Sequence, residues 1–440
     1  MDAVLIEGGR VIDPASGLDA TGDVLLAEGE VKAIATRRGE LRLPAGGRRL
    51  DAEGCIVAPG LIDIHVHFRE PGEGHEETVA TGSAAAINGG FTTVCCMPNT
   101  TPALDTAEAV RRQFALAEAA GAARVYPVGC ATKGRRGEEL APIAAMAEAG
   151  AIAFSDDGDC VASPALMLEA LRAAKAADRC FMQHCQEPTL TRGASMNPGP
   201  TAKRMGQIGW PAVAEELIIE RDVRLNREIG CRYHAQHVSS GESAAIIRRA
   251  REGGEPVTGE ASPHHLLLTD QDCQRYGTEA KMNPPLRTNR DIERLKEAIA
   301  AGVITILATD HAPHPRKKKE VLFAEAAFGI VGLEGALPLY VQALIGDGVL
   351  DWPGLLAMMT ANPAALIGIA ETGFGRLAAA GIADVTVIDP EAEWTIRAEE
   401  FASTGRNCPF DGWPVKGRAI MTIVGGDVRL LREPAREQIA

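Results

Sequence analysis

Short apolar runs alternate with helical stretches over most of this 440-residue chain, and this alternation constrains the fold more than any other feature. The runs lie directly before His65 and at residues 92–97, 124–128, 151–154, 180–183, 233–236, 256–260 and 303–308. Between them lie stretches rich in Ala, Glu and Arg, such as residues 107–118. Strands that alternate with helices are typical of a parallel sheet. Eight such units over roughly 300 residues favour a (β/α)8 barrel over an open, doubly wound sheet.

The two ends of the chain have a different character. Residues 4–34 alternate short β-rich runs with glycine-containing turns, and residues 383–389 and 419–426 show the same pattern. Each fragment is too small to bury a core alone, so we expect the two ends to complete each other in one small satellite domain. The predicted division is a β-domain of residues 1–56 together with 375–440, and a barrel of residues 57–374.

Composition narrows the classes of function. The chain has 45 Lys plus Arg and 59 Asp plus Glu, which gives a formal net charge of −14 at pH 7. A chain with this excess of acidic residues lacks the positive charge that attracts nucleic acid. No apolar run approaches the roughly 18 residues of a membrane span, and the N-terminus lacks a secretory signal. We therefore expect a cytoplasmic protein that binds neither nucleic acid nor membrane, with its ten cysteines reduced.

Ionisable residues gather just after the apolar runs, where a (β/α)8 barrel has its active site. The first run ends with His65 and His67. Residues two apart on a strand face the same side, about 6.6 Å apart, so both histidines can reach one metal. Later run ends add Asp156, Asp157, His184, His237 and Asp310. Together these nitrogen and oxygen donors suit zinc or a similar divalent ion.

Longer motifs of the chain resemble the amidohydrolase superfamily and, within it, the class I bacterial dihydroorotases. They are D-x-H-x-H-x-R-E-P-G at residues 63–72, M-P-N-T at 97–100, K-M-N-P-P-L-R at 281–287, D-H-A-P-H at 310–314 and F-G-I-V-G-L-E at 328–334. The motifs follow the order and spacing of that family, and the resemblance spans nearly the whole chain. It implies an α/β fold, a deformed (β/α)8 barrel with a small β-sandwich built from both chain ends.

One position separates this chain from related cyclic amidohydrolases. Dihydropyrimidinases and allantoinases bridge two metals with a carboxylated lysine near the end of the fourth strand, where this chain has F-S-D-D-G at residues 154–158. In class I dihydroorotases an aspartate takes that place, and by resemblance it matches Asp157, with Asp156 as its neighbour. An ionised carboxylate supplies the same two oxygens.

The resemblance implies a role for each matching residue. The metal ligands, for one or two zinc ions, are implied to be His65, His67, Asp157, His184, His237 and Asp310. Asp310 matches the family's general base and acid. The implied substrate-binding residues are His67, Arg69, Asn99, Asn283, His314, Phe328 and Gly329. Of these, Arg69, Asn99 and His314 match the family's contacts to a substrate carboxylate.

The implied activity is that of a zinc-dependent dihydroorotase, which reversibly cyclises N-carbamoyl-L-aspartate to (S)-dihydroorotate in pyrimidine (UMP) biosynthesis. Arg69 and Asn99 favour this acidic substrate, because hydantoin and allantoin lack its carboxylate. Two alternatives stay open, another cyclic amidohydrolase such as a hydantoinase or allantoinase, and an inactive scaffold subunit of aspartate transcarbamoylase. Inactive relatives typically lose metal histidines, and all four are present here. A homodimer and a complex with that transcarbamoylase are both compatible with an active enzyme.

Four adjacent cations at residues 316–319 depart from the family pattern, which tends to be acidic there. We expect a solvated loop or, alternatively, a basic rim that attracts an anionic substrate. The remaining histidines are expected to have no catalytic role. His234 should be packed, His264 and His265 should make structural hydrogen bonds, and His75 should lie on the surface.

Overall fold

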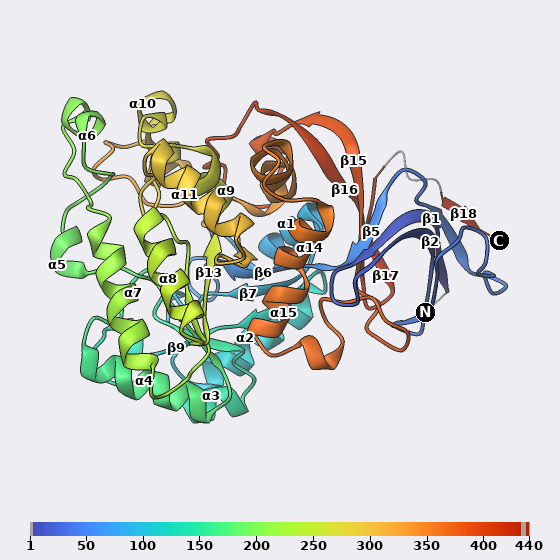
Figure 1. Cartoon of the computed structure of the whole chain (residues 1–440), viewed down its shortest axis with the longest axis horizontal. Coiled ribbons are helices and arrows are strands. Elements are labelled where there is room, and N and C mark those ends of the chain that lie inside the picture. Colours follow the sequence, from blue (N-terminus) through green and yellow to red (C-terminus); the bar gives the residue numbers. More distant parts are fainter. Residues whose placement is uncertain (1–2, 433–436, 440) are drawn as a thin grey trace.

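The computed structural model describes residues 3–432 and 437–439 and has two parts, a barrel of parallel strands and a sheet made from both chain ends (Figure 1). The barrel and its helices fill the left and centre of the view, and both termini lie at the right. This arrangement confirms the predicted deformed (β/α)8 barrel with a sandwich-like terminal unit.

Parallel strands occupy eight positions around the barrel, and each position coincides with one predicted apolar run. The strands are β6 (Leu61–Val66), β7 (Phe91–Cys96), β8 (Arg124–Pro127), β9 (Gly129–Cys130), β10 (Ala153–Ser155), β11 (Cys180–Gln183), β12 (Tyr233–Ala235), β13 (Val257–Ala261) and β14 (Ile306–Leu307). β8 and β9 follow each other directly and share the third position.

The barrel closes irregularly. Its strands form two parallel sheets, β6-β7-β8 and β14-β13-β12-β11-β10-β9. A parallel bridge between Val66 and His311 joins the two sheets on one side. On the other side, the amide of Ile152 donates to the carbonyl oxygen of Pro127 at 3.0 Å. These two contacts complete the ring, so the carboxyl ends of all eight positions meet at one mouth.

Helices lie between successive barrel strands and after the last one, and many of them cover the outside of the barrel (Figure 1). They are α1 (Val79–Gly89), α2 (Ala107–Ala120), α3 (Ile143–Glu148), α4 (Pro164–Ala176), α5 (Pro188–Thr191), α6 (Pro200–Met205), α7 (Val213–Asn226), α8 (Gly241–Glu252), α9 (Pro263–Leu267), α10 (Asp272–Tyr276), α11 (Asn289–Ala300), α12 (Arg316–Lys319), α13 (Ala336–Tyr340), α14 (Trp352–Met359) and α15 (Ala361–Leu366). Short 3-10 or π segments are η1 (Lys133–Arg135), η2 (Gly277–Ala280), η3 (Leu333–Gly335), η4 (Val341–Gly346), η5 (Ala370–Thr372) and η6 (Ala398–Glu400).

Local sequence explains where the predicted helix at residues 107–118 begins and ends. The side chain of Thr106 accepts a hydrogen bond from the amide of Ala109 and so caps the first turn of α2. Gly121 ends the helix with a φ of 60°, a left-handed conformation that glycine adopts at little cost. The helix therefore begins at the predicted residue and extends two residues further.

Both chain ends contribute strands to one nine-stranded sheet. The strands are β1 (Val4–Asp13), β2 (Leu18–Ala27), β3 (Glu30–Ala35), β4 (Arg48–Asp51), β5 (Ile56–Pro59), β15 (Val385–Thr395), β16 (Pro414–Val424), β17 (Asp427–Leu431) and β18 (Glu437–Ile439). Their main order is β17-β16-β15-β5-β1-β2-β3, with β4 between β1 and β18. One apolar core combines Val4 and Ile6 with Val385, Val387 and Ile423, which confirms that the two ends complete each other. The boundaries at residues 56 and 375 stay predictions.

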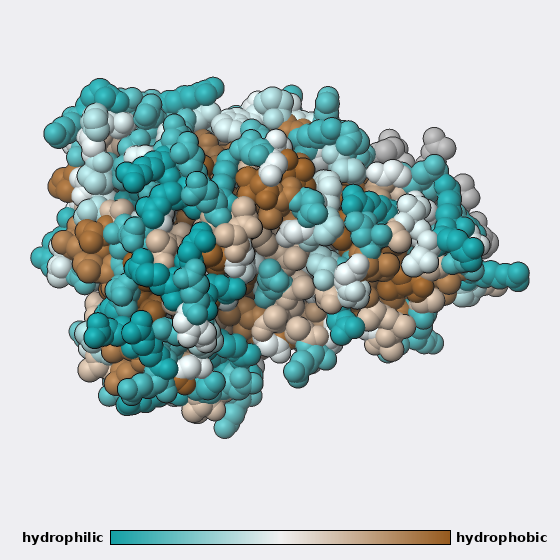
Figure 2. All heavy atoms as spheres, viewed as in Figure 1, coloured by the Kyte–Doolittle hydropathy of each residue, from teal (hydrophilic) through white to brown (hydrophobic). Residues whose placement is uncertain are grey.

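The surface is largely polar in the view of Figure 2, with a group of apolar side chains near α5 and α7. Exposed large apolar residues in this region are Leu190, Ile208, Val213 and Leu217. Within the described part of the chain, no helix is long and apolar enough to cross a membrane. All ten cysteines are free thiols, as predicted.

Candidate active site

The first barrel strand positions two of the predicted metal ligands. His65 lies in β6 and His67 directly follows it. Nδ1 of His65 lies 2.5 Å from Oε1 of Glu260. Because an ionised carboxylate only accepts hydrogen bonds, Nδ1 carries the proton, and Nε2 is left as a free donor of electrons to a metal. That Nε2 lies 3.3 Å from Asp157 and 3.4 Å from Asp310.

His67 has the same arrangement with a different partner. Its Nδ1 lies 2.9 Å from Oδ1 of Asn99. Since an amide oxygen is an acceptor, this contact also directs the lone pair of Nε2 toward the centre of the site. Nε2 lies 3.0 Å from Oδ1 of Asp310 and 3.3 Å from Oδ2 of Asp157. Both histidines of the first strand therefore offer Nε2 to the same two carboxylates.

A second pair of histidines follows β11 and β12. Nδ1 of His184 lies 2.7 Å from Nε2 of His237 and 3.3 Å from Oδ1 of Asp157. Nε2 of His184 lies 3.0 Å from the amide oxygen of Gln186. The main-chain amide of His237 donates to Glu260 at 3.0 Å. Two neighbouring strands thus bring two imidazoles to the other side of Asp157.

The possible ligand atoms form three overlapping groups of three residues. Within each group, the ligand atoms all lie within 4.8 Å of one another. The groups are His65 with His237 and Asp310, His65 with His67 and Asp157, and Asp157 with His184 and His237. All six predicted ligands come together and are buried. Oδ1 of Asp157 has no hydrogen-bond partner in the described structure. A buried carboxylate oxygen without a partner, surrounded by imidazole nitrogens, fits a divalent cation.

Electrostatics keep both aspartates ionised. Burial alone would raise the pKa of Asp157, but the imidazoles of His65 and His67 outweigh it and hold the pKa well below its usual range. The same opposition between burial and the two imidazoles brings the pKa of Asp310 to about 2. Both side chains therefore present negative charge to the centre of the site at neutral pH.

Three residues of the site have backbone conformations that are rare outside glycine. The φ angles are 48° at Arg69, 32° at His237 and 49° at Asp310. Such conformations cost of order 1–3 kcal/mol each and cluster where a function requires a particular side-chain direction. The surrounding barrel holds the three side chains in these positions.

The predicted substrate-binding residues line one pocket of about 240 Å³ at the barrel mouth. These residues are His67, Arg69, Asn99, Asn283, His314, Phe328 and Gly329, and five of the six metal ligands line the same pocket. His65 lies beneath it, fully buried. Nη2 of Arg69 lies 3.3 Å from Nε2 of His314. The ring nitrogens of His314 lie 3.1 Å from Oε2 of Glu76 and 2.8 Å from the carbonyl oxygen of Phe328.

Known proteins give the site its family context. The Dihydro-orotase-like family model matches residues 54–243. The chain is 46% identical over 424 residues to a dihydroorotase of Desulfotalea psychrophila. This alignment covers 96% of this chain and 98% of the relative. It is 44% identical over 425 residues to a dihydroorotase of a Geobacter species (strain M21), with 97% and 98% covered. The chain belongs to the dihydroorotase family.

A solved structure agrees with this membership at the level of the fold. The L-hydantoinase (dihydropyrimidinase) from Arthrobacter aurescens superposes with a TM-score of 0.85 at 26% sequence identity. The alignment covers 100% of this chain and 98% of the hydantoinase. The barrel and the terminal sheet are therefore shared with a cyclic amidohydrolase, as the resemblance to the amidohydrolase superfamily implied.

The basic segment agrees only in part with the expectations for residues 316–319. It forms the short helix α12, in which Lys319 is only 1% exposed. Nζ of Lys319 donates to the carbonyl oxygens of Ala327 at 3.0 Å and Gly329 at 2.9 Å. Lys318 pairs with Glu73 at 3.5 Å and also with the buried Glu76. Arg316 and Lys317 are exposed, as expected of a solvated segment, whereas Lys318 and Lys319 are held by partners within the fold. The basic rim stays a prediction.

Two buried glutamates that support this dihydroorotase site were not found from the sequence. Glu260 contacts His65 and also lies 2.9 Å from Nε2 of His234. A signal for it exists, since Glu260 is an ionisable residue at the end of an apolar run. Glu76 holds His314, and its place in an irregular loop gives no such signal.

His75, His234 and His265 lie where they were expected, whereas Nε2 of His264 is buried without the expected hydrogen bond among the described residues. His234 is fully buried between Thr258 and Glu260. Nε2 of His265 donates to the carbonyl oxygen of Pro284 at 2.9 Å. The side chain of His75 is 56% exposed. His264 is buried beside His265, with ring centroids 4.4 Å apart.

Proposed function

We propose that this protein is a dihydroorotase, which reversibly cyclises N-carbamoyl-L-aspartate to (S)-dihydroorotate in pyrimidine biosynthesis. One observation carries the proposal. A single pocket combines a metal-binding group of histidines and aspartates with Arg69, a half-buried arginine that has no carboxylate within ion-pair distance in the described chain. An amide-hydrolysing centre beside a free guanidinium suits a cyclic amide that carries a carboxylate.

The metal in this proposal is zinc, with one or two ions held by His65, His67, Asp157, His184, His237 and Asp310. Imidazole nitrogens and carboxylate oxygens are ligands that zinc prefers. When bound, such an ion lowers the pKa of a water molecule to about 7 and polarises the carbonyl under attack. Glu260 and Asn99 support the ligand set by fixing which ring nitrogen of each histidine faces the centre.

Asp310 is the proposed general base and acid. In the hydrolytic direction, water adds to the ring carbonyl carbon and the carbon–nitrogen bond breaks. The carboxylate of Asp310 accepts a proton from the attacking water and returns it to the departing nitrogen. The reverse sequence closes the ring and releases water. Its position 3.0 Å from Nε2 of His67, at the floor of the pocket beside the other ligands, suits a group that takes a proton from water bound there.

Arg69, Asn99 and His314 are proposed to bind the substrate carboxylate. The guanidinium of Arg69 offers a planar fork of donors. Oδ1 of Asn99 faces His67, so its amide nitrogen is left to donate to the substrate. These donors have no counterpart to bind in hydantoin or allantoin, which lack the carboxylate.

Asn283, Phe328 and Gly329 are proposed to contact the ring. Nδ2 of Asn283 donates to Gln186 at 3.2 Å, whereas its Oδ1 is buried without a partner among the described residues. That oxygen is available to accept a ring N–H. Gly329 has a φ of 145°, and a Cβ there would lie 2.7 Å from the carbonyl oxygen of Ala312. Only glycine lets the backbone approach this closely.

The first experiment compares turnover of dihydroorotate, hydantoin and allantoin by the zinc-loaded protein, each before and after treatment with a chelator. We expect turnover of dihydroorotate alone, its loss on chelation and its return with zinc. An Arg69→Gln variant is the matched control, because it should lose dihydroorotate turnover while its metal content is unchanged. Turnover of hydantoin instead would favour the hydantoinase alternative, and no turnover despite bound zinc would favour the scaffold alternative.

Association and location stay proposals as well. We propose that the protein acts in the cytoplasm. A homodimer and a complex with aspartate transcarbamoylase are the two assemblies that an active enzyme could form. Light scattering of the purified protein, alone and mixed with the transcarbamoylase of the same organism, tests both assemblies. An unchanged monomer mass in both experiments would contradict them.

A further inference from the structure

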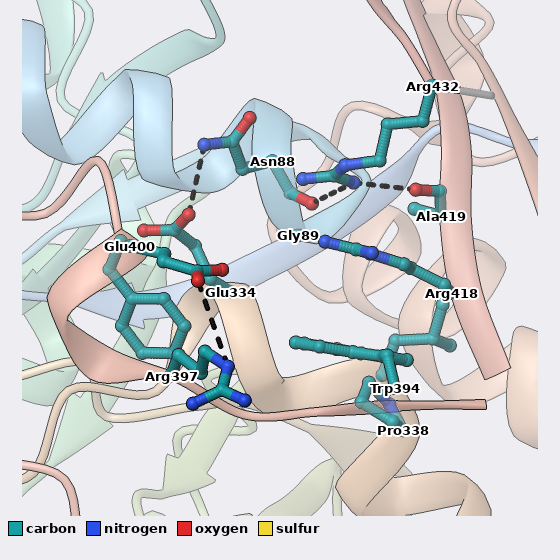
Figure 3. A pocket seen from close by; sticks show the side chains of 12 residues that line it. Asn88, Gly89, Glu334, Pro338, Trp394, Arg397, Glu400, Arg418, Ala419 and Arg432 are labelled. Atoms are coloured by element: carbon teal, nitrogen blue, oxygen red, sulfur yellow. Dashed lines mark hydrogen bonds and ion pairs between the residues drawn. The ribbon is translucent and has the colours of Figure 1, made fainter. Parts of the chain in front are cut away.

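A second recess lies where the barrel meets the terminal sheet (Figure 3). It has a volume of about 80 Å³ and is lined by residues of α1, η3, α13, β15, η6 and β16 and by the residue that follows β17. Its ionisable side chains are Glu334, Arg397, Glu400, Arg418 and Arg432. None of these residues lines the pocket at the barrel mouth.

Arg418 has no anionic partner in this recess. Its guanidinium lies over the ring of Trp394, with Cζ 4.5 Å from the ring centroid (Figure 3). Nε1 of Trp394 donates to the carbonyl oxygen of Gly417 at 3.1 Å, which fixes the ring. Among the residues that the structure describes, no carboxylate lies within ion-pair distance of Arg418. The stacking therefore holds a charged fork whose hydrogen-bond donors are free.

Arg432 faces the same recess and is anchored only by neutral groups. Its Nη1 donates to the carbonyl oxygen of Asn88 at 3.0 Å and to that of Ala419 at 2.7 Å. The described structure gives it no carboxylate partner either. Burial, with the nearby charge of Arg418, lowers the pKa of Arg432 to about 10. A half-buried cation in this situation is stabilised by any anion that enters.

The acidic groups of the recess do not balance these two arginines. Oε2 of Glu334 accepts from Nδ2 of Asn88 at 2.9 Å, and its Oε1 accepts from the amide of Ser403 at 3.2 Å. Burial raises the pKa of Glu334 to about 7, so much of it is neutral at physiological pH. Glu400 is exposed and lies 3.8 Å from its own partner, Arg397. The recess thus has a positive excess that the fold itself does not neutralise.

We propose that this recess binds a small oxyanion, the carboxylate or phosphate group of a metabolite, between Arg418 and Arg432. Arginine forks match the geometry of both groups with two parallel hydrogen bonds. The volume is several times the roughly 10–15 Å³ that one water needs, so it admits a small anion but not a whole nucleotide. The proposal does not depend on the reaction at the barrel mouth.

Calorimetric titration of the zinc-loaded protein with inorganic phosphate, and separately with acetate, tests the proposal. We expect a saturable binding event that weakens at least about tenfold in Arg418→Gln. Arg429→Gln is the matched control, because Arg429 is an exposed arginine of β17 that pairs with Asp427 at 3.1 Å outside the recess. This control should bind as the wild type does. Arg418→Gln should also keep its kcat/KM for dihydroorotate, which separates the event from anion binding at the barrel mouth.

A second variant protects the test against misfolding. Arg432→Lys keeps the positive charge but loses the planar fork, so it should also weaken binding if the two arginines share the anion. Tighter binding of phosphate than of acetate would assign the site to phosphate groups, and the opposite order would assign it to carboxylates. Equal affinity in wild type and both variants, or no saturable binding below about 10 mM, would overturn the proposal.

Discussion

The barrel mouth and the recess beside the terminal sheet are alike in one respect and different in another. Each contains an arginine without a carboxylate partner in the described chain, Arg69 at the mouth and Arg418 in the recess. At the mouth, six buried nitrogen and oxygen ligands lie beneath that arginine. In the recess, an indole ring lies beneath it instead. The comparison teaches that an arginine without a carboxylate partner indicates anion binding. Catalysis at the barrel mouth requires the buried metal ligands as well.

Asp310→Asn should separate the two regions most strongly. The amide has nearly the shape of the carboxylate but cannot accept the proton of the attacking water, so kcat should fall by about 10²–10⁴-fold. Steady-state rates with dihydroorotate measure this loss, and mass spectrometry of bound metal shows whether the ligand set survives. Arg418→Gln is the counterpart in the recess and should keep the wild-type kcat. A fully active Asp310→Asn enzyme would remove Asp310 from the proton path.

Arg69→Lys should change substrate binding more than turnover. Lysine keeps the charge but replaces the bidentate fork with a single point donor, so KM for dihydroorotate should rise about 10–100-fold while kcat changes less. Arg418→Lys should leave KM unchanged, since it lies outside the pocket. If KM stayed the same in Arg69→Lys, the carboxylate would have to bind elsewhere at the mouth.

Lys319→Met should have a smaller effect on the same pocket. Nζ of Lys319 holds the carbonyl oxygens of Ala327 and Gly329, which flank Phe328 in the segment proposed to contact the ring. Removing Nζ leaves these buried acceptors unpaired and loosens the segment, so we expect KM to rise about 3–10-fold. Lys317→Met is the control on the same short helix, because Lys317 is exposed. Equal KM values for the two variants would show that Lys319 does not position the segment.

Lys319 also illustrates where sequence reasoning reaches its limit. The barrel strands were predictable because each is an apolar run, and His65, His67 and Asp310 were predictable because they directly follow such runs. The burial of Lys319 was not predictable, since its partners are carbonyl oxygens that only tertiary packing brings to it. Four consecutive cations look solvent-exposed unless such acceptors are known.

The recess was beyond sequence reasoning for a related reason. Its residues Asn88, Glu334, Trp394, Arg418 and Arg432 come from segments far apart in the chain. None of them belongs to a run whose period predicts a shared location. Arg418 and Arg432 are ordinary members of strand-like segments until the sheet packs against α1 and η3. Sites on a barrel mouth follow from strand order, whereas sites between two units follow only from how the units pack.

Glu334→Gln should affect stability and leave turnover unchanged, and it is the finest test of the positive recess. The folded pKa of Glu334 is about 7, against an ordinary value of 4.5. Between these values the native state holds a proton that the unfolded state has released, so wild-type stability falls as pH rises through this window. Glutamine does not titrate. The stability of the variant relative to the wild type should therefore rise by about 1–3 kcal/mol from pH 4.5 to pH 7.5, as measured by urea unfolding. A difference that is constant with pH would mean that Glu334 stays ionised in the folded protein. Its negative charge would then offset part of the positive charge of Arg418 and Arg432 in the recess.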